Sequence, residues 1–213
     1  MINYFIDSDT PKALNPSNRA SDFATWVYKN TVEKKIGFGI PVNKERLKMG
    51  TYTHEMIDEF FKTQWMIKKR GDVESFIEWK VIRDESDNSP ENILYSSALK
   101  INNKPISCQP DLVLEHVNKN KIIIIERKST TIPANRVSST GWPNIEAQLW
   151  CYSWIDDWSK YSEIFLIGQI WTIADGRKKP IMIDDHFYWK KSDQAHHQRC
   201  KDWFELYGGQ FVI

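Results

Sequence analysis

The sequence predicts an α/β protein with a mixed central β-sheet flanked by helices. Segments with helical spacing alternate with β-branched segments, in the order helix, three or four strands, helix, strand, helix. The run Ile122–Ile125 is aliphatic on both faces and indicates a central strand buried on both sides. At 213 residues the chain is long enough for one core, and we expect one domain over 1–213. Its core spans about 43–207, and 1–42 form an extension with a short helix.

Two helices are expected before the sheet. Ser21 is a candidate N-cap for a short helix that runs to about Lys29. Asn43 is the candidate N-cap of a long helix to about Lys69, and Gly71 follows its basic last turn. Its apolar face recurs at helical spacing: Leu47, Gly50, His54, Ile57, Phe61 and Trp65.

Four strand candidates follow, each bounded by turn-forming residues: Glu74–Arg83, Ile93–Asn102, Ile106–Glu115 and Lys121–Lys128. Asn103-Lys104-Pro105 is the expected turn between the second and third strands. The remaining elements are a helix from Pro143 to about Trp158, strands at Glu163–Ala174 and Pro180–Asp184, and a helix from Ser192 to about Tyr207. Proline suits a first helical turn, and Gly208 is the expected stop of the last helix.

Charge and cysteine content narrow the classes of function. The 29 basic and 28 acidic residues leave a net charge of +1, which excludes a polycation but not an enzyme with a locally positive cleft. The three cysteines, Cys108, Cys151 and Cys200, form no C-x-x-C pair, so we expect no iron–sulfur cluster. With no apolar run near the roughly 20 residues that span a bilayer, and no signal peptide, we expect a cytoplasmic protein without a membrane partner.

Asp111 and Glu126 are the residues around which catalytic chemistry is predicted. They lie on neighbouring predicted strands, so a hairpin pairing brings both carboxylates to one sheet edge. Two hard oxygen donors without a cysteine suit Mg²⁺ or Mn²⁺. Lys128 shares a strand face with Glu126 and can orient a water or neutralise charge on a phosphate. An exposed Glu–Lys ion pair is the plain alternative, but the pair follows four isoleucines that are predicted to be buried.

Here the sequence resembles the PD-(D/E)XK nuclease superfamily. Pro110-Asp111 followed by Glu126-Arg127-Lys128 is similar to the superfamily signature. Gln148-Leu149-Trp150-Cys151-Tyr152 resembles the Q-x-x-x-Y motif of the RecB-like exonuclease branch, and Gly50–His54 resembles the helix-borne histidine of that branch. The resemblance covers about Lys48–Trp158. It implies a restriction-endonuclease-like core. A charged middle residue in the Glu-x-Lys motif is unusual for the superfamily.

The resemblance also implies roles for individual residues. The implied catalytic residues are Asp111, Glu126, Lys128, Gln148 and Tyr152, and the implied metal ligands are His54, Asp111 and Glu126. Gln148 and Tyr152 share a helix face, where they could bind phosphate or brace the lysine, or simply pack in a core. His54 could equally be a buried core histidine.

Further residues near the motifs are candidates for contact with nucleic acid. Ser129 and Thr130 follow the lysine and could donate to a phosphate or merely end the strand, and Trp142 could stack on an unpaired base or anchor a loop. Glu78 could join the metal site or face solvent. His196-His197 lie on the final predicted helix, match none of the motifs above, and are predicted to lie on the surface.

Together these features predict a Mg²⁺- or Mn²⁺-dependent deoxyribonuclease, an exonuclease acting in DNA recombination, repair or defence. Its expected partner is DNA with free ends or single strands. No nucleotide-binding G-x-x-x-x-G-K-[ST] motif is present, so any helicase or recombination motor is a separate chain. Self-association stays open. The alternatives are a restriction-type endonuclease and a catalytically silent nucleic-acid-binding or scaffold protein of the same fold.

Overall fold

The structure is a computed structural model that describes residues 6, 10, 12–33, 79–130, 142–172 and 181–212, with the backbone alone for 181 and 183–188. The predicted helix over 43–69, with His54, and the predicted acid Glu78 lie outside the described residues. The main elements in chain order are α1 (Ala20–Tyr28), β1 (Trp79–Asp84), β2 (Leu94–Ile101), β3 (Lys104–Cys108), β4 (Leu112–His116), β5 (Lys121–Thr130), α4 (Pro143–Ser153), β6 (Glu163–Thr172), β7 (Ile181–Lys190), α5 (Gln194–Tyr207) and β8 (Gly209–Phe211). Short helical turns add a π-helix at Lys29–Glu33 and 3₁₀ turns at Glu85–Asp87, Pro90–Asn92 and Asp156–Trp158.

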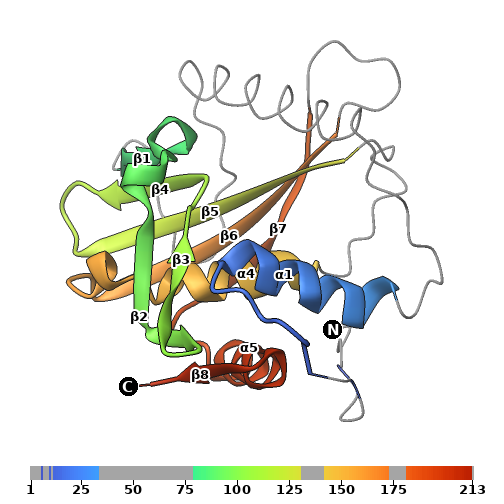
Figure 1. The fold of residues 1–213 in the computed structure, drawn as a ribbon. Helices are drawn as coiled ribbons and strands as arrows, with labels where there is room; N and C mark the ends of the chain where they lie inside the picture. The colour runs from blue at the N-terminus through green and yellow to red at the C-terminus, as the bar shows by residue number, and fades with distance from the viewer. Residues whose placement is uncertain are drawn as a thin grey trace.

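Among the described residues, the larger sheet is five-stranded and mixed. Its strand order is β1-β4-β5-β6-β7. Within the described part of this sheet only the β5–β6 pair is parallel, and Figure 1 shows the two strands side by side through the middle of the sheet. Parallel neighbours need a crossover connection, and α4 supplies it between β5 and β6. The predicted α/β class with a mixed central sheet is therefore confirmed.

Strand β5 is buried on both faces, as the isoleucine run predicts. Ile122 and Ile124 belong to the core that includes the helices, whereas Ile123 and Ile125 belong to a second apolar cluster on the opposite face. All four side chains are fully buried. Because side chains alternate along a strand, Glu126 and Lys128 continue the face of Ile122 and Ile124.

A smaller antiparallel sheet in the described residues, of order β3-β2-β8, corrects the prediction of one strand over 106–115. That segment is two strands in different sheets, because β3 ends at Cys108 and β4 begins at Leu112. Pro110 lies between them, and proline has a fixed φ and no N–H to continue a ladder. The turn before β3 is also one residue earlier than predicted, at Asn102 and Asn103, whose φ values are 50° and 63°. Asparagine tolerates this left-handed conformation better than most residues.

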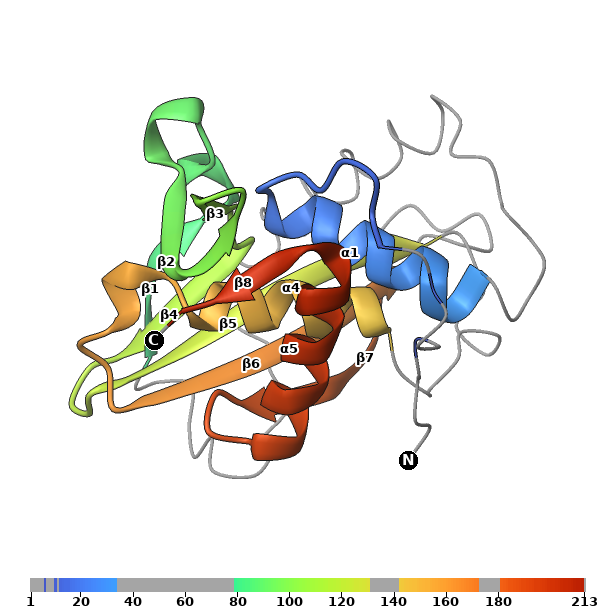
Figure 2. The same ribbon diagram turned by 60° about the horizontal axis from the view of Figure 1, so that its bottom comes forward.

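Helices α1, α4 and α5 pack on one side of the five-stranded sheet (Figure 2). The predicted boundaries need small corrections. Helix α1 begins before Ser21, with Arg19 at the N-cap, and α4 ends at Ser153, after which Ile155 is extended. The N-cap of α5 is Asp193 rather than Ser192, because the Asp193 carboxylate accepts hydrogen bonds from two free N–H groups of the first turn. In the described part of the chain, no helix is both long and apolar enough to cross a membrane.

The end of α5 depends on two consecutive glycines. Gly208 has φ 101°, a left-handed helix stop as predicted. Gly209 starts β8 with its Cα against the core, where an added Cβ would lie 2.3 Å from Cε1 of the buried Phe204 ring. The close approach lets β8 pair with β2 directly after the helix.

We therefore expect Gly209→Ala to destabilise the protein by about 1–3 kcal/mol, the usual cost of overpacking a core. Urea unfolding followed by circular dichroism measures this change. The control is Gln210→Ala, whose exposed side chain in the same strand should change stability by less than about 0.5 kcal/mol. Equal stability of the two variants would show that Phe204 has room to move.

Candidate functional site

The predicted catalytic residues meet near the carboxyl end of β5. Glu126 is 1% exposed and lies opposite Gly168 of β6, which has no side chain to crowd it. Lys128 follows on the same strand face and forms an ion pair with the Glu126 carboxylate. Arg127 is buried as well and, by strand alternation, belongs to the opposite face.

Asp111 is held beside this strand by the backbone. It lies in the bend before β4, and its Oδ2 accepts a hydrogen bond of 2.6 Å from the Arg127 N–H. The next residue, Leu112, pairs with Ile125 in the antiparallel β4–β5 register. The structure thus brings the Asp111 carboxylate next to the backbone that carries Glu126, as the hairpin argument predicts.

The Lys128 ammonium joins the strand to helix α4. Besides Glu126, its Nζ lies 3.1 Å from Oε1 of Gln148. Burial by itself lowers the pKa of Lys128, but the nearby carboxylates of Glu126 and Asp111 outweigh it and raise this pKa above its ordinary value. The side chain therefore stays charged, held between the Glu126 carboxylate and the Gln148 amide.

Gln148 is itself held in place by Tyr152, one helical turn further along α4. The Gln148 Nε2 donates to the Tyr152 hydroxyl at 2.6 Å, and this hydroxyl donates to the backbone carbonyl of Gln109 at 3.0 Å. Burial raises the pKa of Tyr152 well above its ordinary value, and the charges of Glu126 and Asp111 add to this. The phenol is therefore neutral, is 2% exposed, and braces the amide that contacts Lys128.

The structure gives the other sequence candidates less defined roles. Ser129 and Thr130 end β5 and are half-buried. Trp142 precedes α4 and packs against the helix-side core, in keeping with the loop-anchor interpretation. His54 and Glu78 lie outside the described residues, so a third ligand beside Asp111 and Glu126 stays a prediction.

A second polar cluster lies between α4 and α5 and was missed by the sequence prediction. Glu146, His196 and Cys200 are all buried, with potential ligand atoms within 4.8 Å of one another. His196 is 1% exposed, so its predicted surface position is wrong: its Nδ1 lies 3.0 Å from Oε1 of Glu146, and the ring stacks on Trp189. The sequence feature that could predict this cluster is the spacing of His196 and Cys200, which are four residues apart and therefore share a helix face.

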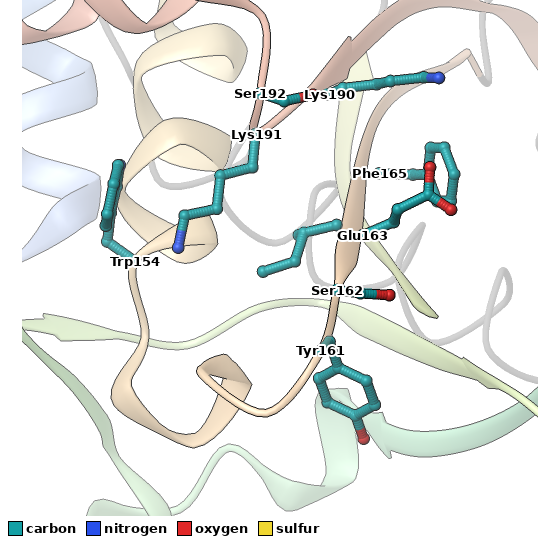
Figure 3. Close-up of a pocket in the computed structure, with 9 residues that line it drawn as sticks. Trp154, Tyr161, Ser162, Glu163, Phe165, Lys190, Lys191 and Ser192 are labelled. Atoms are coloured by element: carbon teal, nitrogen blue, oxygen red, sulfur yellow. The ribbon is translucent and has the colours of Figure 1, made fainter. Parts of the chain in front are cut away.

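A pocket of about 270 Å³ opens at the beginning of β6, at the end of that strand away from Lys128. Figure 3 shows Lys191 reaching toward Trp154 there, and its ammonium lies 3.8 Å from the centre of the indole ring. Burial lowers the pKa of Lys191. None of the predicted site residues lines this pocket.

Comparisons with known proteins add little to these observations. No family model and no curated protein matches the sequence. A solved structure titled "Crystal structure of SSO0001" is similar over 91% of this chain and 78% of that chain, with 15% sequence identity and a TM-score of 0.37. A TM-score below 0.5 does not establish a common fold.

The raised pKa of Lys128 predicts how stability depends on pH. Folding favours the protonated lysine, so this contribution is complete below the unfolded pKa of about 10.4 and is lost as the pH rises through the folded value. Wild type should therefore lose more of its free energy of unfolding above about pH 10 than Lys128→Met does. Urea unfolding at several pH values measures the difference, with Lys104→Met, an exposed lysine of β3, as the control. Parallel curves for wild type and Lys128→Met would contradict the assignment.

Proposed function

We propose that the protein is a metal-dependent deoxyribonuclease with a restriction-endonuclease-like core, of the RecB-like exonuclease kind. One observation carries the proposal. The Lys128 ammonium contacts both Glu126, from its own strand motif, and Gln148, from the downstream helix motif. These are the two motifs whose resemblance suggested the family, and an accidental pair of short sequence matches has no reason to meet at one ammonium group.

The position of Asp111 supports the same function. Its carboxylate accepts a hydrogen bond from the Arg127 N–H, the peptide group directly after Glu126, so the two acids lie on adjoining parts of the same site. Carboxylate oxygens without sulfur are the ligands that Mg²⁺ and Mn²⁺ prefer, and these ions keep several bound waters. Asp111 and Glu126 would hold the ion, which would lower the pKa of a bound water and neutralise charge on the phosphate.

Side chains of the protein would supply the remaining catalytic roles. Hydrolysis joins a water oxygen to phosphorus and breaks the bond to a leaving sugar oxygen, which takes up a proton. Lys128 would stabilise the negative charge that develops on the phosphate, and Gln148 would hold the ammonium in a fixed position. Tyr152, bonded to Gln148 and to the Gln109 carbonyl, would hold the amide in turn. None of these groups reads a base, so we expect little dependence on sequence.

A cleavage assay tests the proposal. Wild type should degrade linear DNA in Mg²⁺ or Mn²⁺, and EDTA should abolish the activity. Lys128→Met should keep metal binding but slow single-turnover cleavage at least about 10²-fold, equivalent to about 2.7 kcal/mol of transition-state stabilisation. Asp111→Asn should lose both metal affinity and cleavage, while Lys104→Met serves as an unaffected control.

Three outcomes would redirect the assignment. Cleavage of closed circular DNA as fast as linear DNA would favour the restriction-type endonuclease. DNA binding without cleavage in any divalent metal would favour the silent scaffold. Unchanged single-turnover rates in Lys128→Met would remove the role of the ammonium group and overturn the mechanism.

A second prediction concerns the hydrogen bonds that Gln148 and Tyr152 form on helix α4. Gln148→Ala should lower activity about ten- to a hundredfold, since a hydrogen bond to a charged group contributes about 1.5–3 kcal/mol. Tyr152→Phe should lower it about five- to tenfold, because it removes a neutral hydrogen bond of about 1–1.5 kcal/mol. Both losses should be equal on substrates of different sequence.

Tyr161→Phe is a matched control for the tyrosine. It also removes a partly buried hydrogen bond, which the Tyr161 hydroxyl donates to Glu115. This bond lies far from Lys128. The activity of this variant should be unchanged. If Gln148→Ala and Tyr152→Phe were both fully active, the helix motif would be ordinary core packing, and the RecB-like assignment would lose its support.

A further inference from the structure

We propose a second metal site, formed by Glu146, His196 and Cys200, which binds a zinc-like transition metal and joins helix α4 to helix α5. It is separate from the Asp111–Glu126 pair and has different ligand chemistry. Glu146 belongs to the first turn of α4, and the other two residues lie one turn apart on α5. The proposal does not depend on nuclease activity.

The distances between ligand atoms suit a four-coordinate ion. Nδ1 of His196 lies 3.0 Å from Oε1 of Glu146 and 3.8 Å from Sγ of Cys200. With typical zinc bond lengths, a tetrahedral site needs about 3.3 Å and about 3.6 Å for these two pairs. All three ligand atoms lie within 4.8 Å of one another, so closing the site needs side-chain shifts on the order of 1 Å.

The donors select the metal. Imidazole nitrogen and thiolate sulfur favour Zn²⁺ and Co²⁺ over Mg²⁺. Nδ1 of His196 is the ring atom that faces Glu146 and Cys200, and Nε2 is buried with no hydrogen-bond partner in the described part of the chain, so Nδ1 is the atom that would bind the metal. A neutral ring is the form that binds metal. Carboxylate, thiolate and a divalent ion are together neutral, which suits a buried site.

Binding requires one proton to leave. Burial raises the pKa of the Cys200 thiol well above its ordinary value, so without metal this group stays protonated. When the sulfur–metal bond forms, the Sγ–H bond breaks and the proton passes to solvent. Metal affinity should therefore rise with pH.

Arg199 competes with the metal for Glu146. Its guanidinium forms hydrogen bonds to Oε1 of the Glu146 carboxylate, the oxygen that also contacts His196. The Arg199 side chain is 32% exposed, so it has a route to solvent that the three buried ligands lack. A metal ion and the guanidinium thus stabilise the same carboxylate in alternative ways, and this competition gives the proposal its sharpest test.

Cobalt titration tests the site, because a Co²⁺–thiolate bond gives a charge-transfer absorption in the near ultraviolet that oxygen ligands cannot produce. The titration uses the Asp111→Asn full-length protein, which removes the other predicted site. We expect about one thiolate-bound Co²⁺ per chain, displaced by Zn²⁺ and unaffected by excess Mg²⁺. Cys200→Ser should abolish the band, and Cys108→Ser, at another buried cysteine, should keep it. His196→Gln should weaken binding at least tenfold, and His197→Gln should leave it unchanged.

The Arg199→Gln variant separates the metal site from a purely hydrogen-bonded network. If the cluster binds metal, removing the competing guanidinium should strengthen Co²⁺ binding severalfold. Should the Cys200 or His196 variants fail to fold, X-ray absorption of the zinc-loaded protein gives the answer, with one sulfur expected at about 2.3 Å. No thiolate band and no sulfur neighbour, or a band that persists in Cys200→Ser, would overturn the proposal and leave Glu146 as an ion-pair anchor.

Discussion

The rest of the site depends on the ion pair between Lys128 and Glu126. Glu126 is 1% exposed at the end of a strand buried on both faces, and a buried carboxylate is costly unless it is paired and hydrogen-bonded. Lys128 supplies the opposite charge, and Gln148 supplies an acceptor for the ammonium. Removing one partner of such a pair leaves an uncompensated charge, typically at a cost of about 3–5 kcal/mol. Strand β5 and helix α4 are therefore tied together by charge as well as by apolar packing.

Features controlled by neighbouring residues could be predicted from the sequence. The isoleucine run predicts the doubly buried strand β5, and Gly208 predicts the end of α5. The division into two sheets was not predictable, because it depends on pairing between distant segments. Strand β8 pairs with β2 across more than a hundred residues, and the break at Pro110 separates β3 from β4 where the sequence pattern predicts one strand.

The polar groups also divide into contacts set by residues close in sequence and contacts between distant segments. Glu126 and Lys128 are two residues apart, and Gln148 and Tyr152 are four apart, so their shared faces follow from strand and helix geometry. His196 is buried, although a surface position is predicted for it from the sequence. Its partner, Glu146, comes from a helix 50 residues earlier, and only the packing of α4 against α5 brings the two together. Sequence spacing carries no information about such a contact.

Helix α4 connects the two polar clusters. Every residue from Ile145 to Ser153 is buried, so apolar pattern alone does not determine which side of the helix faces the sheet. Glu146 and Gln148 are two residues apart, about 200° around the helix axis, so they project to nearly opposite sides. Glu146 contacts α5, and Gln148 contacts Lys128 on β5. Hydrophobic burial is non-directional, whereas these two contacts are directional, so they fix the rotation of α4 between α5 and the sheet. The position of the Lys128 ammonium is thus coupled, through one rigid helix, to the cluster on α5.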